Sequence, residues 1–153
     1  MSRATLLVVI QFTLFGLIGL AFLLLPHTGN ALLRTVGLVL VGSGLVVAFL
    51  AITEHQRAAG QTPNVTPTPK RSSQLITSGL YQFVRHPIYS GVLLCGFGAA
   101  VYQSHLVTAV LVAALYLLLS VKSRYEESLL QRAFRDYTAY MKRTGRFWPG
   151  SDI

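Results

Sequence analysis

Long runs without a charged residue constrain the fold of this chain more than any other feature of its sequence. Residues 4–25 form a run of 22 and residues 35–52 a run of 18, and neither holds a Lys, Arg, Asp or Glu. About 20 apolar residues in a helix cross a hydrocarbon core of roughly 30 Å. Each run therefore predicts a membrane-spanning helix. The short, breaker-rich segment 26–30 between them predicts a tight antiparallel hairpin.

Two further uncharged stretches follow in the second half of the chain. Residues 88–105 hold no Lys, Arg, Asp or Glu, and residues 106–121 form a run of 16 that leads into Lys122. Both are short for a span, so tilt or snorkelling of flanking cations would have to help them cross. We expect an all-α integral membrane bundle of four transmembrane helices.

The positive charge lies almost entirely on one side of this predicted bundle. The chain has 13 Lys and Arg against 5 Asp and Glu, and 12% of its 153 residues are charged. With four spans, twelve of the thirteen cations lie beside the termini and the segment 53–87, and Arg34 lies alone opposite. The positive-inside rule then predicts cytoplasmic termini, in what we expect is a bacterial inner membrane. This arrangement argues against nucleic-acid binding.

We expect one domain, residues 1–153, with three parts. Residues 4–52 form the N-terminal helical hairpin, and residues 53–74 form a cytoplasmic linker rich in Gly, Pro, Thr and Ser. Residues 75–149 carry the polar motifs and are the functional half. The single cysteine, Cys95, excludes an internal disulfide and a multi-cysteine zinc site, so no metal site is expected.

Polar residues gather where the third and fourth predicted helices meet the cytoplasm. The third helix begins in the motif RHPIYSG at residues 85–91, and the fourth ends in RYEE at residues 124–127. Two adjacent carboxylates at a membrane boundary are costly unless they are paired or used. Two interpretations stay open. Either Glu126 and Glu127 pair with Arg85 or His86, or the cluster binds a cationic, hydroxyl-rich ligand.

Two other patterns have a structural and a functional interpretation. Gly91, Cys95 and Gly98 share one helix face, which suits close helix packing and also the approach of a flat ligand. Apolar residues recur at helical spacing from Leu130 to Met141 and predict a C-terminal amphipathic helix in the membrane interface. The aromatic tail at residues 147–149 is then either an interfacial anchor or a lid over the polar cluster.

These motifs, in this order, resemble the isoprenylcysteine carboxyl methyltransferase family, which groups with phospholipid and other small integral-membrane methyltransferases. The resemblance is carried by T-x-G-x-Y at 77–81, by RHP-x-Y-x-G at 85–91, and by R-x-EE at 124–127. It covers roughly residues 75–149, and the tail RFWP at 146–149 is similar too. Arg135 departs from the family, which often has Gly after the Phe.

The resemblance implies methyl transfer from S-adenosyl-L-methionine, bound by residues 75–149 as a cofactor-binding catalytic half. It implies Tyr81, His86, Pro87, Tyr89, Gly91, Glu126 and Glu127 as cofactor-binding residues. Arg85 and Arg124 are the candidate catalytic residues, which would hold an acidic group of the substrate.

The expected substrate is lipophilic and isoprenylcysteine-like, enters from the bilayer and is methylated on a carboxylate. A phospholipid amine or a thiol stays open as the acceptor. A non-enzymatic helical membrane protein or transporter is the alternative from another class. It would place charges inside a span, and none lies deep in the four predicted ones.

Overall fold

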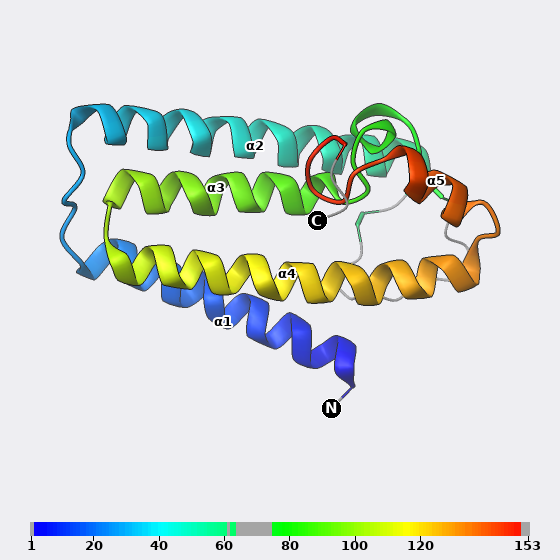
Figure 1. The fold of residues 1–153 in the computed structure, drawn as a ribbon, viewed down its shortest axis with the longest axis horizontal. Helices are drawn as coiled ribbons and strands as arrows, with labels where there is room; N and C mark the ends of the chain where they lie inside the picture. Colours follow the sequence, from blue (N-terminus) through cyan, green and yellow to red (C-terminus); the bar gives the residue numbers. More distant parts are fainter. Residues whose placement is uncertain (1, 61, 64–74, 151–153) are drawn as a thin grey trace.

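The computed structural model describes residues 2–60, 62–63 and 75–150 (Figure 1). In these ranges the chain is helical and forms no β-strand, which confirms the all-α prediction. The elements in chain order are α1 (Arg3–Leu24), α2 (Ala31–Ala59), the 3₁₀ helix η1 (Gly79–Gln82), α3 (Pro87–Gln103), α4 (Leu106–Ala133) and α5 (Tyr137–Arg143).

Local signals in the sequence explain where several helices begin and end. The Ser2 side chain accepts a hydrogen bond from the Thr5 amide, and Asn30 accepts one from the Leu33 amide, so both residues cap helix N-termini. Pro87 stands in the first turn of α3, where its missing N–H costs nothing. Gly60 ends α2 in the left-handed conformation that glycine adopts without strain.

Three helices, α1, α2 and α4, are long and apolar enough to cross a membrane. Helix α3 has 17 residues, a length of about 25 Å at 1.5 Å per residue. By length and composition the candidate spans among the described residues are thus three, one fewer than the four expected, and α3 is the additional helix of the all-α bundle (Figure 1). Helix α3 ends within the predicted stretch 88–105, where Ser104 takes a left-handed conformation with φ 53°.

Helices α2 and α3 pack closely, backbone against backbone. A Cβ at Gly44 would lie 2.7 Å from the Cys95 Sγ atom, and one at Gly91 would lie 2.7 Å from the Ala48 amide nitrogen. A Cβ at Gly98 would meet the backbone of α2 at the same distance. The small-residue face of α3 is therefore a packing surface against α2.

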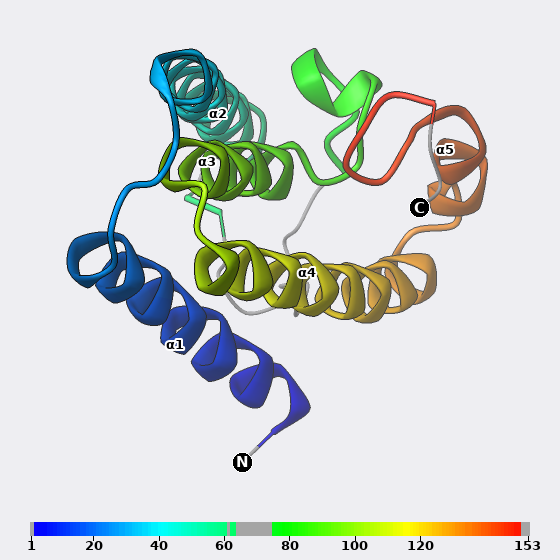
Figure 2. The ribbon, with the colours of Figure 1, turned by 60° about the vertical axis from the view of Figure 1, so that its left-hand side comes forward.

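The prediction of a tight hairpin between the first two helices is wrong. Helices α1 and α2 run in opposite directions but lie on opposite sides of α3 and α4 (Figures 1 and 2). Helix α1 packs against α4 instead, and α2 packs against α3. The glycines explain the pairing, because Gly37 and Gly44 of α2 fit against α3, whereas Gly16 and Gly19 of α1 have no atom within 4 Å of an added Cβ.

The second half of α2 and the end of the chain also differ from expectation. Residues 53–59 of the predicted linker are the last turns of α2, and its residues 61 and 64–74 lie outside the described ranges. The predicted amphipathic helix is divided, because Phe134 is extended and separates α4 from the seven-residue α5. Tyr137 and Tyr140 of α5 are buried within the protein.

The C-terminal tail folds back onto the start of α3. The Arg85 amide donates to the Gly145 carbonyl at 2.8 Å, and the His86 amide donates to the Arg146 carbonyl at 3.1 Å. The Phe147 ring is 1% exposed and packs in the core with Leu93, Leu115 and Leu119. The tail is therefore part of the folded bundle, and its interpretation as a plain interfacial anchor is wrong.

Candidate active site

The polar cluster forms where α3, α4 and the tail meet at one end of the bundle. Hydrogen bonds with the tail fix the backbone at Arg85 and His86, just before α3 begins. Ser90, one turn into α3, donates its hydroxyl to the Phe147 carbonyl at 2.6 Å. Helix α4 brings Glu126 and Glu127 to the same place. Segments separated by about forty residues in the sequence thus build one site.

Glu127 is the centre of a buried ion-pair network. Its carboxylate accepts from Arg85 Nε at 2.7 Å and from Arg146 Nη2 at 3.2 Å, and His86 Nε2 lies 3.3 Å from it. Arg85 also donates to the backbone carbonyls of Met141 and Thr144. A buried carboxylate that is paired with two guanidinium groups holds its surroundings together, because removing it would leave two charges unpaired.

Glu126 has different surroundings from its neighbour. Its side chain is 26% exposed and accepts a hydrogen bond from the Tyr89 hydroxyl at 3.1 Å. The His86 Nδ1 atom lies 3.7 Å from the same carboxylate. No guanidinium pairs with Glu126 within residues 75–150 or the described N-terminal part. Its carboxylate therefore keeps the capacity to accept hydrogen bonds from a ligand.

Two buried polar atoms at this site make no hydrogen bond of good geometry with the described residues, although one of them, on His86, lies 3.3 Å from the Glu127 carboxylate. They are His86 Nε2 and Arg146 Nη1. A buried donor or acceptor without a partner costs about 1–3 kcal/mol, so such atoms are rare unless a ligand or water satisfies them. Their position beside Glu126 and Glu127 makes this cluster the candidate binding site.

Aromatic rings surround the ion-pair network. The His86 ring stacks on Tyr89 with centroids 5.3 Å apart and planes at 8°. Phe147 meets the Tyr89 and Tyr116 rings edge-on at 6.4 and 6.2 Å. Such rings exclude water and present electron-rich faces to a cation.

Tyr81 lies behind the cluster in η1. Burial, and after it the negative charge of Glu126, raises the pKa of Tyr81 above its ordinary value of 10.0. Its carbonyl accepts from the Tyr140 hydroxyl at 2.5 Å, and burial raises the pKa of Tyr140 to about 12. Both phenols therefore stay neutral at physiological pH and act as hydrogen-bonding and packing groups.

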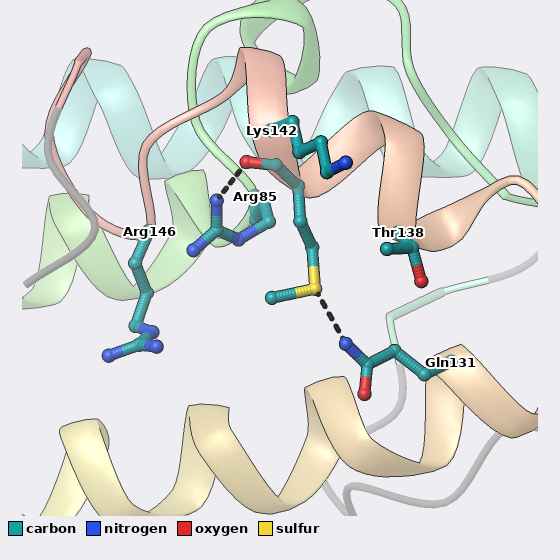
Figure 3. A pocket seen from close by; sticks show the side chains of 6 residues that line it. Arg85, Gln131, Thr138, Lys142 and Arg146 are labelled. Atoms are coloured by element: carbon teal, nitrogen blue, oxygen red, sulfur yellow. Dashed lines mark hydrogen bonds between the residues drawn. The ribbon is translucent and has the colours of Figure 1, made fainter.

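A cavity of about 240 Å³ opens beside the network, between α4, α5 and the tail (Figure 3). Its lining residues are Arg85, Gln131, Thr138, Met141, Lys142 and Arg146. Three of the six are cationic, so the cavity suits an anionic or strongly polar group.

The structure brings together most of the residues that the sequence singles out. Arg85, His86, Tyr89, Glu126 and Glu127 contact one another directly. Their roles toward a ligand stay predictions. Glu127 pairs with Arg85 and His86, as one of the two interpretations expects. For Glu126, the other interpretation, binding of a cationic and hydroxyl-rich ligand, stays open.

Three predicted site residues are placed differently from expectation. Gly91 faces α2, where an added Cβ would meet the Gly44 carbonyl at 2.7 Å, so its position gives it a packing role. Arg124 is exposed and forms no ion pair with the described residues. Arg85 is 4% exposed and its guanidinium is engaged by Glu127 and by backbone carbonyls, while it also lines the cavity; its role toward a substrate stays a prediction.

Sequence reasoning missed two buried side chains close to this site. Lys122 is 1% exposed, and its Nζ atom donates to Gln11 Oε1 of α1 at 2.5 Å. The sequence holds a signal for each. Gln11 is the one amide in an otherwise apolar run, and Lys122 precedes Glu126 by four residues, which places both on one face of α4.

Known proteins resemble this chain over much of its length. Residues 32–137 match the phospholipid methyltransferase family. The probable protein-S-isoprenylcysteine O-methyltransferase of Oryza sativa subsp. indica is 30% identical over 138 residues, which cover 82% of this chain and 71% of that protein. Protein-S-isoprenylcysteine O-methyltransferase B of Arabidopsis thaliana is 35% identical over 72 residues, or 46% of this chain and 36% of that protein.

A second group of relatives carries a different name. The cobalt-zinc-cadmium resistance protein CzcN of Cupriavidus metallidurans is 38% identical over 81 residues. That match covers 52% of this chain and 38% of the relative, so the chain corresponds to well under half of that protein's length.

Proposed function

The chain belongs to the phospholipid methyltransferase family, and from that premise we propose that it is an integral membrane methyltransferase that uses S-adenosyl-L-methionine. We further propose that it methylates a carboxylate of a lipophilic, isoprenylcysteine-like acceptor. The observation that carries the proposal is Glu126, a partly exposed carboxylate that accepts a hydrogen bond from Tyr89 of the His86–Tyr89 stack and forms no ion pair with an arginine of the described residues.

The residues present fit the chemical groups of this cofactor. Its ribose hydroxyls and ammonium need an acceptor, and Glu126 has the capacity to accept. Its carboxylate needs donors, which Arg146 Nη1 and the cationic cavity beside it supply. Its sulfonium is favoured next to aromatic faces such as Tyr89. When bound, the cofactor supplies a methyl group on a positively charged sulfur.

The residues of this chain would bind, orient and keep out water. Tyr89, Pro87 and Tyr81 would form the wall on the side of η1 and α3. Glu127 would act as a positioning residue, because it ties Arg85 before α3 to Arg146 in the tail. A carboxylate acceptor is already a nucleophile at neutral pH, so alignment and the exclusion of water by Phe147 would suffice.

A phospholipid amine is the second candidate acceptor. That acceptor must lose a proton during transfer, and His86, whose two ring nitrogens lie 3.3 Å from Glu127 and 3.7 Å from Glu126, is the candidate base. A lipophilic acceptor of either kind would enter from the bilayer. The N-terminus and the polar cluster lie at the same end of the bundle (Figure 1), and we propose that this end faces the cytoplasm.

Calorimetric titration of detergent-purified protein with S-adenosyl-L-methionine tests the proposal. We expect saturable binding by the wild type and at least about tenfold weaker binding by Glu126→Gln, because the amide replaces a charged acceptor. Arg132→Gln, which removes an exposed cation of the same helix, is the matched control and should bind as the wild type does. Absence of binding by the wild type, or equal binding by Glu126→Gln, would overturn the proposal.

A further inference from the structure

A buried cation lies between α1 and α4, next to the polar cluster. Lys122 is 1% exposed, and Gln11, which accepts its hydrogen bond at 2.5 Å, is 7% exposed. The Lys122 Nζ atom also lies 5.3 Å from the centroid of the Tyr89 ring. The hydroxyl of that same tyrosine donates to Glu126. Tyr89 therefore connects the lysine to the carboxylate proposed to bind the cofactor.

The Lys122 ammonium group forms no close ion pair with a described residue, although the charge of Glu126, one turn along α4, acts on it. No Asp or Glu of the described residues lies within 4.0 Å of its ammonium group, whereas Arg85 and Arg146 share Glu127. An ammonium group carries three donor protons, and the described hydrogen bond to Gln11 uses one of them. Its remaining capacity suits an additional acceptor with negative charge.

A purely structural role does not explain a lysine at this position. Two neutral side chains would join α1 to α4 without the cost of burying a charge in an apolar bundle. An ionisable residue within a membrane-spanning helix is by default a candidate for function. Lys122 also stands one helical turn before Glu126, on the side of α4 that leads into the apolar span.

We propose that Lys122, held by Gln11 and Tyr89, is the specificity-determining residue that selects an anionic methyl acceptor. This inference rests on the proposed function, since it assigns the acceptor of the same site. The ammonium attracts the carboxylate of a lipophilic acid and repels the ammonium of a phospholipid amine. The residue thus favours carboxyl over amine acceptors through charge, without touching the cofactor-binding carboxylate.

The test compares the binding of two probes that differ in charge alone. N-Acetyl-S-farnesylcysteine carries a carboxylate at neutral pH, and its primary amide has the same lipophilic chain and no charge. Equilibrium binding to the wild-type protein in detergent, without cofactor, should be at least about tenfold tighter for the acid, as expected for a charge-assisted hydrogen bond. Lys122→Met should bind both probes equally, and Lys122→Arg should keep the preference for the acid.

A second variant leaves the lysine in place. Gln11→Glu puts a carboxylate against Lys122 and should remove the preference for the acid while the amide binds as before. Arg132→Gln, an exposed cation of the same helix, should keep the preference. Equal binding of the two probes by the wild type, binding of neither, or an unchanged preference in both Lys122→Met and Gln11→Glu would overturn the inference.

Failure of the proposed function would look different. It would show as absent binding of S-adenosyl-L-methionine by the wild type, a measurement that uses neither probe.

Discussion

Glu126 and Glu127 are adjacent in sequence and have different surroundings in the fold. Successive residues of a helix point about 100° apart, so one turns toward Arg85 and Arg146 and the other toward Tyr89. Glu127 is buried and fully paired, and Glu126 is partly exposed. Glu127 is therefore the carboxylate that holds the site together, and Glu126 is the one that is available to a ligand.

Exchange of each carboxylate for its amide tests this division. We expect Glu127→Gln to lower the free energy of unfolding by about 3–5 kcal/mol, because two buried guanidinium groups lose their anion. We expect Glu126→Gln to change it by no more than about 0.5 kcal/mol, as at other partly exposed positions. Denaturant unfolding in detergent, followed by Trp148 fluorescence, measures both. Similar losses in the two variants would contradict the assignment.

Tyr140 allows a prediction about pH. Burial raises the pKa of its phenol to about 12, above the ordinary value of 10.0 that applies in the unfolded chain. The folded state therefore holds the proton more tightly, so this contribution to stability is complete below pH 10 and is lost as the pH rises toward 12. Melting temperatures between pH 8 and 12 should fall less steeply in Tyr140→Phe. Parallel curves for the two proteins would show that Tyr140 is not responsible.

At the scale of elements, the closest contact is the interface between α2 and α3. Gly37 and Gly44 of α2 face Gly98 and Gly91 of α3, and these backbones approach too closely for a Cβ atom. The interface holds α3 in the position from which it presents His86 and Tyr89 to α4. Packing of small residues thus supports the site without contributing a polar group.

A pair of alanine substitutions in α2 tests the interface. Gly44→Ala should lower the free energy of unfolding by about 1–3 kcal/mol, because the added methyl group meets the Gly91 carbonyl and the Cys95 side chain at 2.7 Å. Gly42→Ala is the matched control on the same helix, since no atom lies within 4 Å of its added Cβ. It should be neutral or raise stability by up to about 1 kcal/mol. Thermal unfolding in detergent distinguishes the two, and equal effects would refute the contact.

The sequence predicts where the helices lie along the chain better than it predicts which helices pack together. Uncharged runs and capping residues locate α1, α2 and α4, because length and hydropathy are local properties. The partner of α1 depends on which surfaces fit, and a short loop alone does not determine that. The uncharged stretch 88–105 likewise locates α3, which ends at Gln103, just before the left-handed Ser104.

The sequence likewise predicts only part of the candidate site. The motifs at 85–91 and 124–127 indicate which residues meet, and the structure brings most of them together. They do not indicate how the charges are shared, because Arg146 reaches Glu127 only through the folded-back tail. The sequence alone also does not show that Arg85 is engaged by Glu127 and by backbone carbonyls. The hydrogen bond between Lys122 and Gln11 joins residues 111 positions apart and has no local signature.

At the scale of the whole molecule, the fold places a polar end on an apolar bundle. The outward faces of α1, α2 and α4 carry exposed apolar side chains such as Leu23, Leu38 and Leu117, as contact with lipid requires. The 3₁₀ helix η1, α5 and the tail gather at one end of the bundle, around the ion-pair network (Figure 1). A lipophilic acceptor and a polar donor could reach such a site from different phases.

The most direct test of the central claim is transfer of a labelled methyl group from S-adenosyl-L-methionine to N-acetyl-S-farnesylcysteine by the purified protein. Base treatment releases methanol from a methyl ester and leaves a methylated amine intact, so the released label identifies the acceptor. We expect base-labile product from the wild type, unchanged product from Arg132→Gln, and at least about tenfold less from Glu126→Gln. A wild type that forms no base-labile product, or a Glu126→Gln variant that forms as much as the wild type, would contradict it.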